Sequence, residues 1–272
     1  MLNLAEIENP HPTHCKSCGA PLAGPFCSQC GQKVITERFT LRKVFGDLLS
    51  NLFNLEKGFF HTIKILFVAP EEVIGGYIGG QTKKYYHPIR LLLILLTISA
   101  LISVSFSIWE HQTGDIIELY KEIGLINGPE DEARMVNIMG FMSKFLTVVP
   151  LLLIPFMSAA SYLLYKSQKL YYAEHCIANI YVMAQGTLLG LVPMAIYAFF
   201  PDTTAYSFMI GIGIYLVLYS RLYRRFFGAD AFGSLIFSFI TIIMGYLLMF
   251  LFIGVATVVI VLIAILCHKF LL

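Results

Sequence analysis

The sequence predicts an all-α integral membrane protein, a bundle of about five transmembrane helices that follows a cysteine-rich knuckle and a cytoplasmic amphipathic helix. Of the 272 residues, 57% are hydrophobic and only 13% are charged, whereas a soluble domain carries about 25% charged residues. The apolar residues form long uncharged runs, which is typical of a chain that crosses a bilayer. The net charge of +2 is too small to favour nucleic acid as a partner.

Two Cys-x-x-Cys-Gly pairs lie within the segment HCKSCGAPLAGPFCSQCGQK (14–33), formed by Cys15 with Cys18 and by Cys27 with Cys30. The first 38 residues have no apolar run of signal-peptide length, so we expect this end of the chain to stay in the reducing cytoplasm. There, paired cysteines favour a metal over a disulfide. Four thiolates predict a closed structural site, for zinc first and for iron as the alternative.

The knuckle is too small to have a core of its own, so metal binding is expected to supply its folding free energy. Four apolar residues lie between the two pairs: Pro21, Leu22, Pro25 and Phe26. They either form a contact surface for a protein partner or fill the interior of the module. Lys16 and Lys33 alone are too few for a phosphate-binding surface.

Residues 39–87 are predicted to form an amphipathic or interfacial segment. Apolar residues recur at i, i+3, i+4 and i+7 from Leu41 to Phe53, with Thr40 as a possible N-cap. A second short helix is expected over 57–68. Both helices either pack on the bundle or lie in the membrane interface.

Residues 71–90 are predicted to be the loop that leads into the membrane. Its G-G-x-x-G-G pattern follows no strand and does not match a dinucleotide-binding fingerprint. Five residues are predicted to anchor the chain at the interface, with ammonium and phenol groups in the headgroup layer: Lys83, Lys84, Tyr85, Tyr86 and Arg90.

Five apolar stretches follow, and a span needs about 20 residues. We expect Pro150, Pro155 and Pro193 to bend their helices. The last stretch is long, and we favour one helix over a hairpin broken near Gly254. The stretches are 89–109, 141–165, 177–200, 205–220 and 233–267. The domains are thus a lead (1–14), the knuckle (15–33), the segment 39–87 and the bundle (88–272).

Basic residues near the span ends predict a cytoplasmic N-terminus, since they concentrate on the inner side of a membrane. The loop 110–140 is rich in acidic residues, as an external loop can be, and Pro129 is expected to start a helix there. The predicted inner flanks hold Lys83, Lys84, Arg90, Lys166, Lys169, Arg221, Arg224 and Arg225, against Lys121, Arg134, Lys144 and Lys269 on the outer flanks.

One group of polar residues lies at the start of the third stretch. It either lines a pocket for a lipid headgroup or small polar ligand, in which His175 and Glu174 are the titratable groups, or forms hydrogen bonds between helices. We favour the hydrogen bonds. His87 is a further residue that could join the group in space. On a helix, Tyr171, His175 and Asn179 share one face, and Glu174, Tyr181 and Gln185 form the adjacent stripe.

Ionisable residues are scarce in the rest of the apolar stretches. With the second span taken as 145–165, the spanning segments hold no Asp, Glu, Lys or Arg apart from Arg90 at the edge of the first stretch. This argues against a proton- or sodium-coupled transporter, in which an intramembrane carboxylate is common. The sequence also contains no metalloprotease, hydrolase or P-loop motif, so an enzyme is not expected.

The order of the motifs resembles a known family. A C-x-x-C-G…F-C-x-x-C-G-Q ribbon is followed by Y-I-x-G (77–80), K-Y-Y-x-P (84–88) and Y-A-E-H (172–175). This is similar to an uncharacterised bacterial family of zinc-ribbon-headed membrane proteins classed as a domain of unknown function, and more distantly to the five-helix Yip-type proteins. The resemblance implies an architecture and no catalytic residues. It also marks Glu174 and His175 as positions to test.

These observations predict a non-enzymatic inner-membrane scaffold or accessory subunit. Its cytoplasmic ribbon would dock a protein partner, and its bundle would contact membrane lipid. The alternative is a transporter, channel or lipid-binding protein with a polar site around Glu174, His175 and Asn179. An enclosed polar cavity that reaches Asn179 would favour the alternative, and a packed interior would favour the scaffold. The oligomeric state is left open.

Overall fold

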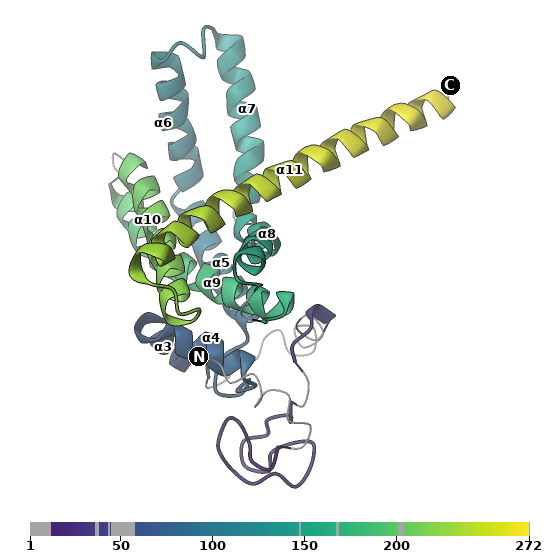
Figure 1. Ribbon diagram of the computed structural model, residues 1–272. Coiled ribbons are helices and arrows are strands. Elements are labelled where there is room, and N and C mark those ends of the chain that lie inside the picture. Colours follow the sequence, from purple (N-terminus) through teal and green to yellow (C-terminus); the bar gives the residue numbers. More distant parts are fainter. Residues whose placement is uncertain are drawn as a thin grey trace.

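The computed structural model describes residues 12–35, 38–42, 44, 58–146, 148–166, 169–200 and 204–271. The described residues from Gly58 to Leu271 form nine helices, arranged as in Figure 1, and the predicted all-α class is confirmed to that extent. The helices are α3 (Gly58–Val68), α4 (Pro70–Ile78), α5 (Pro88–Ser105), α6 (Ile108–Glu122), α7 (Pro129–Leu146), α8 (Val149–Leu164), α9 (Tyr172–Phe199), α10 (Thr204–Arg225) and α11 (Ala231–Leu271).

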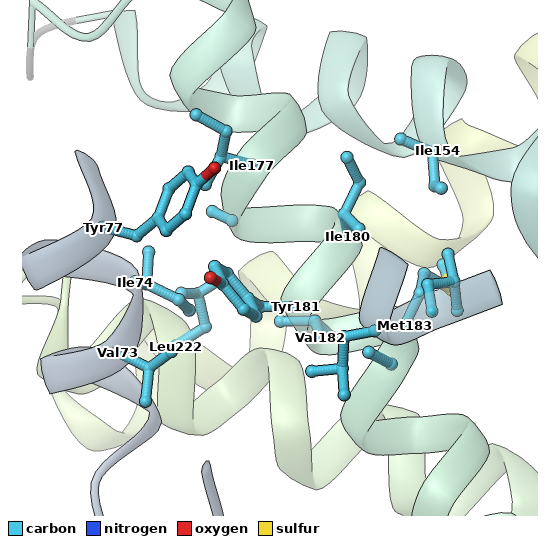
Figure 2. Close-up of a cluster of buried hydrophobic side chains, with 14 of the residues drawn as sticks. Val73, Ile74, Tyr77, Ile154, Ile177, Ile180, Tyr181, Val182, Met183 and Leu222 are labelled. Atoms are coloured by element: carbon cyan, nitrogen blue, oxygen red, sulfur yellow. The ribbon is translucent and has the colours of Figure 1, made fainter. Parts of the chain in front are cut away.

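Helix α9 is the centre of the bundle and packs against α3, α4, α5, α8 and α10. Residues 173–186 of this helix are all buried, which explains why no single apolar stripe distinguishes its sequence. Figure 2 shows Ile177 and Tyr181 of α9 meeting Tyr77 of α4, with Leu222 of α10 close by. Helix α11 completes the bundle by packing on α8 and α10.

The segment before the first span differs from its prediction, because α4 occupies much of the expected loop 71–90. Pro70 both ends α3 and opens α4, since proline suits the first turn of a helix, where its missing N–H is not needed. Glu71 and Glu72 follow in that first turn, at the positive end of the helix dipole. The loop is therefore confined to 79–87, and α3 and α4 pack on the bundle.

Three of the predicted interface anchors face protein instead of lipid. Tyr85, Tyr86 and Arg90 are each less than 9% exposed, so these three side chains are buried in the protein and do not reach the headgroup layer as predicted. The Tyr85 hydroxyl donates to the Glu72 carboxylate at 2.8 Å. Lys83 is exposed, and Lys84 pairs with Glu72 at the surface.

Only the start of the predicted amphipathic helix can be compared with the structure. Leu41, Arg42 and Val44 are helical and Val44 is buried, while the rest, with the predicted stripe up to Phe53, lies outside the described residues. The predicted second helix over 57–68 is confirmed as α3.

Helices α6 and α7 form a hairpin that extends from the end of the bundle opposite to the knuckle (Figure 1). The prediction that Pro129 starts a helix is confirmed, with three acidic residues in the first turn of α7. The apolar stretch 141–165 is divided, because α7 ends at Leu146 and α8 begins at Val149. Pro150 lies in the first turn of α8, and Pro155 and Pro193 lie inside α8 and α9.

Three described helices are long and apolar enough to cross a membrane: α5, α9 and the Ala231–Ile263 part of α11. The last stretch is a single helix, as favoured from its sequence, and its 41 residues extend about 60 Å. Its outer half projects beyond the other helices (Figure 1), and side chains from Phe250 to Ile263 are almost all exposed. These features are those of a membrane protein.

Candidate metal centre and polar contacts of the bundle

The four predicted cysteine ligands lie together. Sγ atoms of Cys15, Cys18, Cys27 and Cys30 are all within 4.8 Å of one another, with Cys15 to Cys30 at 3.6 Å and Cys18 to Cys27 at 3.5 Å. A tetrahedron with metal–sulfur bonds of about 2.3 Å has sulfur–sulfur edges of about 3.8 Å. The four thiols therefore fit one tetrahedral metal ion.

The two knuckles repeat the same backbone geometry twelve residues apart. Cys15 N–H donates to the Ala20 carbonyl at 2.7 Å, and Cys27 N–H donates to the Gln32 carbonyl at 2.8 Å. Each knuckle then turns at a glycine with positive φ, Gly19 at 76° and Gly31 at 68°, where a side chain would be strained. This explains the glycine after each second cysteine.

The thiols of the centre differ in how readily they ionise. A hydrogen bond from the Cys30 backbone N–H is the main reason that the pKa of Cys27 falls to about 6. Desolvation raises the pKa of Cys30 to about 12. Four thiolates cannot coexist at this separation without a cation, so an ion that binds here releases protons from the remaining thiols. The donor set is closed and leaves no ligand position for a reacting water.

Most of the apolar residues between the knuckles lie at the surface of the module, although Leu22 packs against the buried Cys15, Ala20 and Cys27. The Phe26 side chain is 59% exposed, Pro21 and Pro25 are exposed, and Leu22 is half-buried. We call Pro21, Leu22, Pro25 and Phe26 the ribbon tip.

The ribbon rests on the turn between α4 and α5. Gln32 Nε2 donates to the Gly80 carbonyl at 2.8 Å, and the Lys83 N–H donates to Gln32 Oε1 at 3.4 Å. Gln32 is only 3% exposed. A residue next to the metal ligands thus connects the knuckle to the bundle. Its position beside the last Cys-Gly pair was visible in the sequence, but its partner was not.

A second contact joins the N-terminal segment to the start of α9. Arg38 and Glu174 form a buried ion pair, with side chains 9% and 0% exposed. Arg38 Nε donates to Glu174 Oε1 at 3.0 Å, and its guanidinium also lies 3.7 Å from the centre of the Tyr171 ring. Glu174 Oε2 accepts the Tyr171 N–H at 2.8 Å, so the same carboxylate caps the helix. Sequence analysis singled out Glu174 and missed Arg38.

The remaining polar residues of the predicted group belong to separate contacts. Asn179 Nδ2 donates to Ser161 Oγ at 3.1 Å, and Asn179 Oδ1 accepts from the Tyr219 hydroxyl at 2.8 Å. His175 Nδ1 lies 3.1 Å from Ser161 Oγ. These side chains come from α8, α9 and α10 and are all nearly fully buried. Direct hydrogen bonds thus link three helices around Asn179.

Two further members of the group support the segment before the first span. The Tyr181 hydroxyl donates to the Tyr86 carbonyl at 2.6 Å, and Gln185 Nε2 donates to the Leu66 carbonyl at 2.7 Å. His87 does not join them directly, although its ring contacts Tyr77, which in turn contacts Tyr181. Ser161 and Tyr219 were missed because a lone serine or tyrosine in an apolar helix gives no sequence signal of its own.

Comparisons with known proteins identify one segment of the chain. Residues 56–100 are similar to a family described as "Protein of unknown function (DUF3667)". This segment holds α3, α4, the turn on which the ribbon rests and most of α5, and it does not include the cysteines. No curated protein and no solved structure matches the chain.

Proposed function

We propose that this protein is a non-enzymatic membrane scaffold or accessory subunit whose metal-bearing ribbon docks a protein partner. The observation that carries the proposal is the exposed ribbon tip. A 59% exposed phenylalanine on a small module is a plausible anchor for a protein interface, since aromatic residues dominate binding energy when a partner buries them.

The contacts between the ribbon and the bundle support this role. The Gln32 side chain holds the ribbon to the turn between α4 and α5, while the tip residues are exposed or half-buried. A module that is fixed on one side and exposed on the other can present its tip at low entropic cost. The closed four-thiolate donor set fits a structural ion and no hydrolytic role.

The identity of the ion, the number of membrane crossings and the orientation of the chain are part of the same proposal. The ion is zinc, and the bundle crosses the inner membrane of a bacterium five times with the N-terminus in the cytoplasm. The excess of basic residues on the inner flanks supports this orientation. The α6–α7 hairpin, which extends from the other end of the bundle (Figure 1), is then external.

Replacing Phe26 with glutamate should release the partner and leave the metal in place. The charged side chain stays solvated on the free ribbon but is costly to bury in an interface. Crosslinking and affinity purification from membranes would compare Phe26→Glu with the wild type and with Gln29→Glu, a change at another exposed ribbon position. Proteins lost with Phe26→Glu and kept with Gln29→Glu are the expected result. An identical set in all three samples would contradict docking at the tip.

A polar ligand site is the second candidate, and one observation favours it. His175 Nε2 is buried and has no hydrogen-bond partner among the described residues, although Nδ1 faces Ser161. If the protein is a scaffold, His175→Phe should lower the free energy of unfolding by about 1 kcal/mol, because one hydrogen bond between membrane helices is lost. Native mass spectrometry of this variant should then show the same bound lipids as the wild type. Loss of one specific lipid or small molecule with this variant would instead support the ligand site.

A further inference from the structure

The Gln32 residue has two roles at once, one in the knuckle and one in the bundle. Its backbone carbonyl accepts the Cys27 N–H at 2.8 Å, and this bond closes the second knuckle. Its side-chain amide donates to the Gly80 carbonyl at 2.8 Å and accepts the Lys83 N–H at 3.4 Å. The Ser17 hydroxyl from the first knuckle donates to the same side-chain oxygen. Both halves of the metal site therefore converge on one buried glutamine.

The turn that receives Gln32 is shaped for the ribbon. Gly80 has a φ of +99°, which a residue with a side chain adopts only with strain. A Cβ atom at this position would lie 3.1 Å from Lys16 Cδ of the first knuckle. The ribbon and the turn thus approach each other closely at a glycine, which gives a physical reason for part of the G-G-x-x-G-G pattern.

The other end of this turn is held without the ribbon. The Tyr86 N–H donates to Thr62 Oγ1 of α3 at 2.7 Å, and the Tyr86 carbonyl accepts the Tyr181 hydroxyl of α9 at 2.6 Å. The turn therefore has several supports. Carbonyls of α4 accept the Gly80 and Gln81 N–H groups, the ribbon contacts the Gly80 carbonyl and the Lys83 N–H, and the bundle holds the other end at Tyr86.

The ribbon support depends on the metal. A module of about twenty residues has almost no core, with Cys15, Ala20 and Cys27 as its buried apolar residues, so its fold needs the ion. When the ion leaves, the knuckle that positions Gln32 loses its main source of stability. The Gly80 carbonyl and the Lys83 N–H then lose their fixed partner.

We propose that metal occupancy of the ribbon is coupled through Gln32 to the order of the turn at Gly80–Lys83, so that the loaded ribbon clamps the connection between α4 and α5. The clamp is independent of the docking function proposed above, because it involves only contacts inside this chain. Coupling of this kind is reciprocal: an ion that orders the turn binds less tightly when the turn cannot accept the ribbon.

Hydrogen exchange of the full-length protein in detergent tests whether the bound metal orders the turn. Stripping the metal from the wild type with a chelator should raise amide exchange roughly tenfold at Lys83, whose N–H donates to Gln32, about the effect of losing one hydrogen bond. Tyr86 should stay protected, as should Gly80 and Gln81, whose N–H groups donate to α4 carbonyls. Gln32→Ala should give the same rise with the metal still bound, whereas Gln29→Ala should resemble the wild type. Unchanged exchange at Lys83 in the stripped wild type would overturn the proposal.

Metal affinity tests the reverse effect, that of the turn on metal binding. Its variant changes the turn and not the ribbon, so this test remains decisive even if Gln32→Ala loses its metal. Gly80→Ala should weaken metal binding on the order of tenfold in competition with a chromophoric chelator. Gly124→Ala is the matched control, because Gly124 also has a positive φ, of 73°, but lies in the hairpin between α6 and α7. Equal affinities for Gly80→Ala, Gly124→Ala and the wild type would exclude the coupling.

Discussion

Replacing Cys15 and Cys18 with serine is expected to abolish metal retention. The two residues supply half of a four-sulfur donor set whose atoms lie within 4.8 Å of one another, and a serine hydroxyl is a poor substitute for a thiolate. Structural zinc contributes about 10–16 kcal/mol to the folding of small modules, so the ribbon should unfold without it. Elemental analysis of the purified protein, as metal per chain, is the measurement.

Cys176→Ser is the control for this prediction. Cys176 is buried in α9, and its replacement removes a thiol without touching the ribbon. Its metal content should equal that of the wild type. A full equivalent of metal in the Cys15→Ser, Cys18→Ser variant would show that the ion is bound elsewhere. The same analysis distinguishes zinc from iron.

Glu174→Ala should destabilise the protein by about 3–5 kcal/mol, the usual cost of removing one partner from a buried ion pair. Two effects add at this position. The Arg38 guanidinium, 9% exposed, is left without its carboxylate, and α9 loses the group that accepts the Tyr171 N–H. Denaturant or thermal unfolding in detergent measures the loss.

Glu132→Ala provides the comparison, because Glu132 pairs with Lys121 at 2.7 Å on the exposed hairpin, where the side chains are 40% and 44% exposed. Surface pairs contribute about 0–1 kcal/mol, so this variant should be nearly neutral. A double-mutant cycle with Arg38→Ala isolates the pair itself. If Glu174→Ala were as mild as Glu132→Ala, the contact would not hold the N-terminal segment to α9.

The sequence predicted the features that depend on local pattern. The cysteine spacing gave the metal ligands, because two tight turns bring both pairs together without help from the rest of the chain. Pro129 and its acidic neighbours gave the start of α7, and an uninterrupted apolar run gave α11. Each of these follows from chemistry within a few residues.

The features that the sequence did not predict depend on partners far along the chain. Arg38 and Glu174 are 136 positions apart, and Gln32 and Gly80 are 48 apart. Tyr85 and Tyr86 looked like interface anchors because the sequence reads the same whether a tyrosine ring faces lipid or protein. Only the packing of α3 and α4 onto the bundle decides that they are buried.

The length of α11 has a consequence for the membrane around the protein. A hydrocarbon core is about 30 Å thick and transmembrane helices incline by up to about 40°, so a single crossing contains at most about 40 Å of helix. The 33-residue apolar segment Ala231–Ile263 extends about 50 Å. This excess is a positive hydrophobic mismatch, relieved by stronger inclination or by local thickening of the bilayer. Thick bilayers of long-chain lipids should therefore suit this helix better than thin ones.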